Sequence, residues 1–194
     1  MALKETIINE SLKLFSLKGF ISTSLQDILS ASKTSKGGFY NHFASKEALF
    51  FQVLDEARII WRDRNLDGLD QTGQHLDKVI RLLYNYKNRY LLDAEKFPGG
   101  CIFIMFAVEL GDQRPHLSEE VQKGFVGLKS MIKRMLDQSK DEGELKAEVR
   151  SGEMAEIIFN SMLGASVSFS ADKSVEKLDA SINAIIEFLG SLRK

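Results

Sequence analysis

The sequence predicts an all-α fold of about nine helices. Apolar residues recur at helical spacing along all 194 residues, and only two prolines interrupt the chain. Strand-like alternation of apolar and polar residues is hard to find. Prolines, glycines and short polar stretches divide the helical segments from one another.

The first helix is expected over residues 3–18. Ile8, Leu12 and Phe15 recur at i, i+4 and i+7, so they form one apolar stripe. Gly19 follows, and glycine suits the left-handed residue that ends a helix.

Two short helices are expected next. Ser24 is a good N-cap for a helix over residues 25–32, and Asp27 places negative charge against its first amides. A third helix is expected from Ser35 or Lys36 to about residue 42, with Gly37 and Gly38 in its first turn. Each glycine costs up to about 1 kcal/mol there, which is tolerated where the backbone must approach something closely. A capped helix, a break and a short helix are the outline of a helix-turn-helix.

The rest of the chain is expected to be helical too. Ser45 caps a fourth helix that runs towards Trp61, and the Asp- and Gly-rich residues 65–74 form a loop. Further helices are expected at residues 75–95, 101–110, 118–141, 152–170 and 174–192.

Composition excludes several classes of protein. One cysteine cannot form an internal disulfide, and three separated histidines indicate no metal site, so we expect neither metal nor cofactor. No Gly-rich phosphate loop or nucleophile elbow is present, so we do not expect an enzyme. The first residues do not read as a secretory signal, and no apolar run spans a bilayer, which makes the cytoplasm the expected location. Net charge is −1 overall, yet basic residues outnumber acidic ones over residues 1–46.

Three blocks of residues carry a family resemblance. They are residues 23–28 (TSLQDI), 34–43 (TSKGGFYNHF) and 45–49 (SKEAL), preceded by Phe15 and by Gly19-Phe20. In this order and spacing they resemble the signature of the TetR family of bacterial regulators, over roughly residues 5–55. One departure is Ser32-Lys33, where the family usually has a small residue and a glycine in the turn.

The resemblance implies a helix-turn-helix DNA-binding domain over residues 1–46 and a helical ligand-binding and dimerisation domain over residues 47–194. The third helix would then lie in the major groove. Lys36 can reach guanine acceptors or a phosphate, and Asn41 can read an adenine edge. The expected DNA-binding residues are Ser24, Gln26, Lys33, Thr34, Ser35, Lys36, Gly37, Gly38, Tyr40, Asn41, His42 and Lys46.

The last two helices are expected to form the interface of a homodimer. Apolar residues of the last helix alternate at spacings of four and three, as in a helix that packs along another helix. In the alternative interpretation, these stripes face only the core of their own subunit. The expected interface residues are Ile158, Phe159, Met162, Leu178, Ile182, Ile185 and Leu189.

An aromatic-rich middle region is the expected ligand site, since the resemblance implies an inducer pocket there. Aromatic residues at helical spacing are otherwise plain core, and Glu109 otherwise pairs with a basic residue of a neighbouring helix. Cys101 is either a redox sensor or an inert buried thiol. The expected ligand-binding residues are Trp61, Tyr84, Tyr90, Phe97, Cys101, Phe103, Phe106, Glu109 and Phe125.

These features together predict a ligand-responsive transcriptional regulator. Since repression is the family's usual mode, we expect a repressor that binds double-stranded, near-palindromic operator DNA as a homodimer. An unidentified small-molecule inducer would release it. The alternative is a helical small-molecule-binding or protein-interaction module without DNA binding, which would leave the basic N-terminal segment unexplained.

Overall fold

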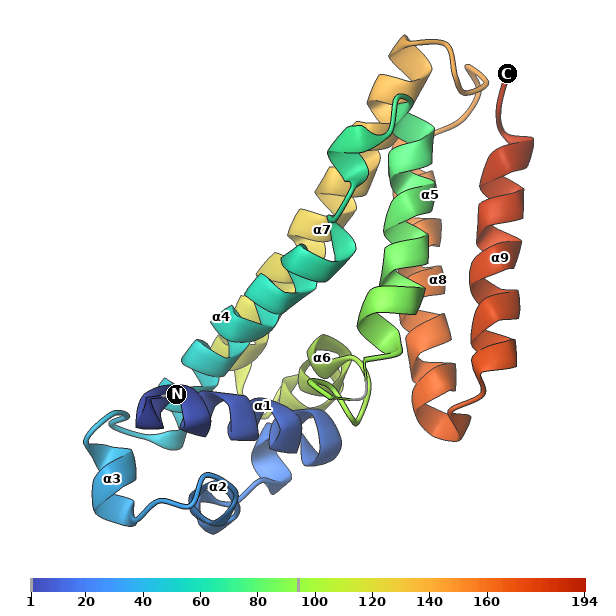
Figure 1. The fold of residues 1–194 in the computed structure, drawn as a ribbon. Coiled ribbons are helices and arrows are strands. Elements are labelled where there is room, and N and C mark those ends of the chain that lie inside the picture. Colours follow the sequence, from blue (N-terminus) through green and yellow to red (C-terminus); the bar gives the residue numbers. More distant parts are fainter. Residues whose placement is uncertain (1, 94) are drawn as a thin grey trace. The chain divides into compact units, whose positions relative to one another are not determined.

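The computed structural model describes residues 2–93 and 95–194, and within them it contains nine α-helices and no β-sheet (Figure 1). The helices are α1 (Leu3–Ser22), α2 (Leu25–Ala31), α3 (Lys36–Tyr40), α4 (Lys46–Asn65), α5 (His75–Asn85), α6 (Ile102–Leu110), α7 (Pro115–Asp141), α8 (Ser151–Asp172) and α9 (Val175–Ser191). Two short helical turns, η1 (Leu69–Gln71) and η2 (Tyr86–Leu91), flank α5. The all-α prediction is confirmed.

The chain forms two compact units. Unit 1 comprises Met1–Trp61 and Asp93–Val121, and unit 2 comprises Arg62–Leu92 and Gln122–Lys194. The N-terminal helices therefore share unit 1 with α6. The domain boundary expected after residue 46 lies inside unit 1, because α4 begins at Lys46 and continues without a break to Asn65.

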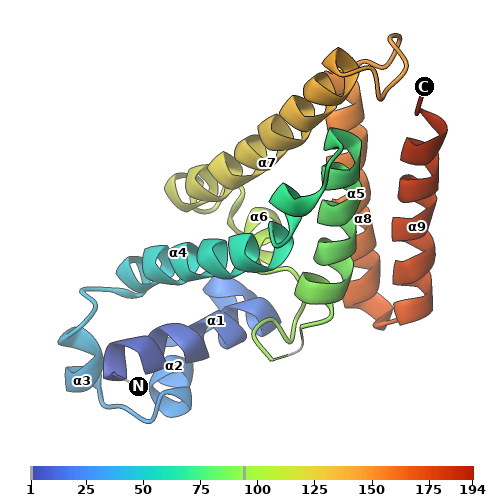
Figure 2. The same cartoon turned by 45° about the horizontal axis from the view of Figure 1, so that its top comes forward.

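Unit 1 is organised around a cluster of four phenylalanines. Phe50 of α4 lies with its ring centroid 4.8 Å from that of Phe106 of α6 and 5.2 Å from that of Phe20. Phe15 of α1 contacts both Phe20 and Phe106 edge-to-face, and all four rings are buried. Such aromatic pairs stabilise beyond the area they bury. α1 also packs against α2, which lies beside it in Figure 2, and against α6.

Unit 2 contains α8 and α9 side by side, joined by a short turn (Figure 1). The stripe predicted as a dimer interface lies between these helices and the rest of the unit. Its seven side chains, Ile158, Phe159, Met162, Leu178, Ile182, Ile185 and Leu189, are all buried within the single chain. The stripe is thus the core of its own subunit, and a side chain already covered there is not free to contact a second copy.

The helix expected over residues 75–95 is shorter than predicted. α5 ends at Asn85, and the next six residues form a π-helix, η2. Within this turn Lys87 is buried, and its ammonium pairs with the carboxylate of Asp179 of α9 at 2.8 Å. A buried charge requires such a partner.

The first turn of α5 is capped from a distant loop. Gln74, at the N-cap, supplies no side-chain hydrogen bond, but the carboxylate of Glu144 accepts from the amides of His75 and Leu76, both at 3.0 Å. Burial alone would raise the pKa of Glu144. The hydrogen bonds from the Ser139 hydroxyl and from these two amides outweigh burial, so its pKa lies below the usual 4.5.

A pH dependence of stability follows from this cap. A carboxylate whose folded pKa is lowered contributes stability above its unfolded pKa, and the contribution is lost as pH falls through the folded pKa. We expect Glu144→Gln to lower the free energy of unfolding by about 1 kcal/mol at pH 7, the partly exposed position reducing the effect. In urea titrations the difference from wild type should begin to shrink as pH falls through the unfolded value of about 4.3, and it should disappear only once pH lies below the lowered folded pKa.

The exposed Glu148 of the same loop offers a matched control. Glu148→Gln should leave the unfolding free energy within about 0.5 kcal/mol of wild type at every pH, as is usual for a surface substitution. A Glu144→Gln effect that persisted unchanged at low pH would contradict the assignment.

Candidate nucleic-acid interface

The start of α2 is held by a reciprocal capping box. The Ser24 hydroxyl accepts from the Asp27 amide at 3.1 Å, and the Asp27 carboxylate accepts from the Ser24 amide at 2.9 Å. Hydrogen bonds from the Ser24 amide and hydroxyl lower the pKa of Asp27. The predicted cap is confirmed. Because the Ser24 hydroxyl already takes part in this cap, its contribution to an external contact is shared with the helix.

The turn between α2 and α3 keeps a regular geometry despite its unusual sequence. Lys33 occupies the left-handed region at φ 51°, where the family usually has glycine. The amide of Lys33 donates to the Ser30 carbonyl at 3.3 Å, and the amide of Thr34 donates to the Leu29 carbonyl at 3.0 Å. These are the two bonds of a Schellman motif. A lysine there costs roughly 1–2 kcal/mol of backbone strain, and its side chain is exposed.

The short helix α3 has one buried side and one exposed side. Ser35 caps it, with its hydroxyl accepting from the Gly38 amide at 3.1 Å. Phe39 is fully buried and packs against Phe43 at 5.5 Å between centroids. Tyr40 is 54% exposed, so the other side of α3 faces solvent with a large aromatic ring.

The two glycines of α3 have different surroundings. A Cβ on Gly38 would lie 2.3 Å from the Thr34 hydroxyl, so glycine is needed there for packing. A Cβ on Gly37 would meet only the Ser35 hydroxyl, at 3.8 Å, which is ordinary contact. No packing reason for glycine at position 37 lies within the described residues. A bare backbone there leaves room for close approach from outside.

Most of the predicted DNA-binding residues are exposed to solvent. Nine of them are exposed: Ser24, Gln26, Lys33, Ser35, Lys36, Gly37, Tyr40, Asn41 and His42. Thr34, Gly38 and Lys46 are half-buried. Among the residues that the structure describes, no ion pair or hydrogen bond engages the Lys36 ammonium or the side-chain amide of Asn41. Both side chains are therefore available to a ligand.

Lys46 is placed differently from the others. Its ammonium donates to the carbonyls of Phe20 and Thr23, both at 2.8 Å, and lies 4.3 Å from the centroid of the Phe20 ring. Burial lowers the pKa of Lys46, and the nearby charge of Glu109 opposes that shift. The side chain thus holds the end of α1, and a phosphate contact would have to come from the amides at the start of α4.

The residues predicted to bind a ligand are divided between the two units. Trp61, Phe97, Cys101, Phe103, Phe106 and Glu109 belong to unit 1, whereas Tyr84, Tyr90 and Phe125 belong to unit 2. Phe97, Cys101, Phe103, Phe106 and Tyr90 are buried, and Tyr84 is exposed. Phe106 belongs to the four-phenylalanine cluster, and Glu109 binds backbone amides of α1 rather than lining a pocket.

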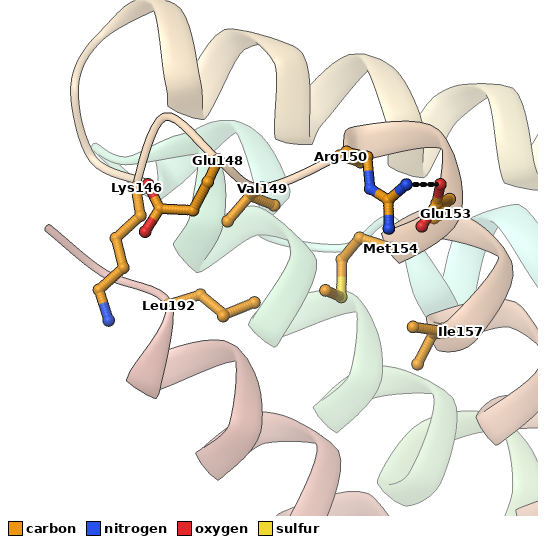
Figure 3. A pocket seen from close by; sticks show the side chains of 8 residues that line it. All are labelled: Lys146, Glu148, Val149, Arg150, Glu153, Met154, Ile157 and Leu192. Carbon is orange, nitrogen blue, oxygen red and sulfur yellow. Dashed lines mark ion pairs between the residues drawn. The ribbon is translucent and has the colours of Figure 1, made fainter.

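Unit 2 contains a pocket that is lined by residues other than the predicted ligand-binding ones. It measures about 390 Å³ and lies at the α7–α8 loop, the start of α8 and Leu192 (Figure 3). Arg150 and Glu153 pair across its rim at 2.7 Å. Its lining residues are Lys146, Glu148, Val149, Arg150, Glu153, Met154, Ile157 and Leu192, and none of them is a predicted ligand residue.

Sequence reasoning did not identify the exposed side of α8. Six exposed residues follow one another there at spacings of four and three, a heptad-like pattern. They are Glu153, Ile157, Asn160, Gly164, Val167 and Ala171. The same spacing can be read from the sequence, but the buried side of α8 is the more hydrophobic one, so sequence periodicity favours that side as the interface. No cluster of three potential metal ligands is found in the described part of the chain, and none of its helices is long and apolar enough to cross a membrane.

The capped α2, the Schellman turn and the exposed side of α3 define a helix-turn-helix DNA-binding protein. Residues 7–53 match the family described as "Bacterial regulatory proteins, tetR family", and residues 76–185 match "Tetracyclin repressor-like, C-terminal domain". The chain belongs to the tetR family of bacterial regulatory proteins and is a DNA-binding transcriptional regulator.

Individual relatives agree with this assignment. The chain is 25% identical over 187 residues to the HTH-type transcriptional repressor DhaR of Mycobacterium sp. (strain GP1), which covers 96% of this chain and 91% of that protein. A TetR transcriptional regulator from Chloroflexus aurantiacus J-10-fl superimposes with a TM-score of 0.91 at 26% identity, over 98% and 96% of the two chains. The regulator CifR, solved with 26-base-pair operator DNA, shares the fold with a TM-score of 0.83 at 21% identity, over 94% and 95%.

Proposed function

We propose that this regulator is a ligand-responsive repressor that binds a near-palindromic operator as a homodimer, with α3 of each subunit in the major groove. The observation that carries the proposal is the exposed surface of α3 and its flanks, where nine of twelve predicted contact residues are free of the core. Two such helices in a symmetric dimer would meet major-groove faces about 34–36 Å apart, or a multiple of that distance.

The side chains of this surface suit two kinds of contact. Lys36 and Asn41 carry the donors and acceptors that read base edges in the major groove. Tyr40 and the Thr34 hydroxyl suit phosphate oxygens, which position the protein without specifying a sequence. At Gly37 the backbone itself can approach the DNA, because no Cβ intervenes.

We propose the exposed side of α8, with the adjoining side of α9, as the dimer interface. Ile157 and Val167 on α8 and Phe188 on α9 are 45%, 52% and 43% exposed in the single subunit. Gly164 lies between the first two, and a Cβ there meets no atom within 4 Å. Small residues allow helices to approach closely, so a second copy packed at Gly164 would cover the apolar side chains on either side.

We propose that the inducer binds within residues 76–185, the region that matches the C-terminal domain family and contains all of the predicted ligand residues except Trp61. A small molecule can release the operator only through unequal affinity for two arrangements of the protein. By reciprocity, operator DNA then weakens inducer binding by the same factor.

Operator binding is tested by gel-shift with the DNA upstream of the gene itself. We expect Lys36→Ala to weaken operator binding about tenfold. If Lys36 contacts a phosphate, the slope of the logarithm of the binding constant against the logarithm of the salt concentration should also become shallower by about one. Lys78→Ala removes the same charge from unit 2 and should leave both quantities unchanged. Equal wild-type affinity for the operator and a scrambled duplex at physiological salt would contradict the proposal.

A further inference from the structure

α1 is interrupted at Gly19. This residue has φ 80° and ψ 171°, and one further helical turn, Phe20–Ser22, follows it. In an unbroken helix the amides of Phe20 and Ile21 would donate to carbonyls four residues earlier. The break removes those acceptors, so both amides need partners from elsewhere.

The carboxylate of Glu109, on α6, supplies these partners. Its Oε2 accepts from the Phe20 amide at 2.6 Å, and its Oε1 accepts from the Ile21 amide at 2.8 Å. The positive φ favours glycine at position 19, and a Cβ there would lie 2.5 Å from Oε1, so the carboxylate would have to move away from the turn. The negative charge also suits the start of a helical turn.

Lys46 holds the other end of the same turn. Its ammonium donates to the carbonyls of Phe20 and Thr23, so a carboxylate and an ammonium bind opposite ends of three residues. The Thr23 hydroxyl closes the break by donating to the Gly19 carbonyl at 2.6 Å. The turn is therefore specified by side chains from α6 and α4.

This turn leads directly into the proposed DNA surface. Ser24, the N-cap of α2, is two residues beyond Ser22, and Gln26 lies in the first turn of α2. α6 falls within residues 76–185, the match to the C-terminal domain family, yet it packs in unit 1. The Gly99 backbone, just before α6, is so close to α1 that a Cβ there would lie 1.7 Å from the Ser16 carbonyl oxygen.

We propose that Glu109 is a positioning residue for operator binding, through which the state of α6 is reported to α2. The proposal rests on the operator-binding function proposed above. When the carboxylate binds the two amides, the Phe20–Ser22 turn and the start of α2 are held in the arrangement described here. A displacement of α6 withdraws the carboxylate, leaves two amides unpaired, and loosens the turn that orients Ser24 and Gln26.

The test compares Glu109→Gln with Asp112→Asn, an exposed matched control three residues away. Operator affinity is measured by gel-shift per folded molecule, and amide hydrogen exchange is measured with and without operator. We expect Glu109→Gln to weaken operator binding about tenfold, because hydrogen bonds to a charged acceptor are lost. Exchange at residues 20–22 should accelerate in this variant while the amides of residues 7–15 keep their protection. Asp112→Asn should behave as wild type.

A second expected result separates positioning from a merely structural role. Operator DNA should increase the protection of residues 20–22 in wild type, and Glu109→Gln should lose most of that increase. Glu109→Asp keeps the charge but is shorter by one methylene, so its operator affinity should fall between those of wild type and Glu109→Gln. Wild-type operator affinity in folded Glu109→Gln would overturn the inference, as would lost affinity with unchanged exchange at residues 20–22. Absence of operator binding by wild type would instead overturn the proposed function.

Discussion

Gly164→Glu is expected to convert the protein into a folded monomer whose operator affinity is lower by about 100-fold or more. Gly164 lies in the middle of the exposed side of α8, and a side chain there meets nothing within its own subunit. The subunit should therefore fold, since replacing a helical glycine favours the helix. In a dimer the carboxylate would be buried without a partner. A monomer has only one helix-turn-helix, so it loses the gain in operator affinity that two linked binding sites give, which is typically about 10²–10⁴-fold.

Sedimentation and gel-shift measure the two parts of this prediction. Gly124→Glu makes the same change on α7, where a Cβ also meets nothing within 4 Å, and this control should remain dimeric with normal affinity. Ile182→Asp should instead unfold the subunit, because Ile182 is fully buried in the core. A stable Gly164→Glu dimer at micromolar concentration would place the interface elsewhere.

Phe106→Ala is expected to lower the free energy of unfolding by about 3–5 kcal/mol, a large part of the stability of a typical domain. Phe106 is fully buried and joins α6 to Phe15 of α1 and Phe50 of α4. Its removal leaves a cavity where these three helices meet. Thermal and urea unfolding measure the loss of stability. Operator affinity should also fall, because the helix-turn-helix loses order.

Phe51 is the matched control for this prediction. Phe51 follows Phe50 on α4 but is 37% exposed. Phe51→Ala should therefore lower the free energy of unfolding by less than about 1.5 kcal/mol. A Phe106→Ala protein with wild-type stability and an altered response to inducer would restore Phe106 to the ligand site.

Local rules are sufficient to explain the helix caps and the buried anchor of the helix-turn-helix. The Ser24 cap, the Ser35 cap and the burial of Phe39 depend on neighbours within four residues, so their roles follow from spacing. Lys46 is one of the residues that the sequence predicts to bind DNA. Its actual partners, the Phe20 and Thr23 carbonyls, lie more than 20 residues away along the chain.

The sequence by itself determined the all-α class, the helix-turn-helix and the caps that begin α2 and α4. These features arise from helical periodicity and from short-range hydrogen bonds, both of which are encoded within a few consecutive residues. It also showed that α8 and α9 are amphipathic, but periodicity cannot say whether an apolar stripe faces its own core or a second copy.

Only the tertiary structure decided which stripe is buried and which backbone amides the Glu109 carboxylate binds. Ile182 and its neighbours fill the core, which leaves the side of α8 around Gly164 exposed. Glu109 and Phe20 are 89 residues apart, and nothing local to either position indicates that their segments meet. Their pairing requires the break at Gly19, the close approach of Gly99 and the packing of four phenylalanines together. Such contacts depend on how all the surfaces fit, and packing, unlike periodicity, is a property of the folded whole.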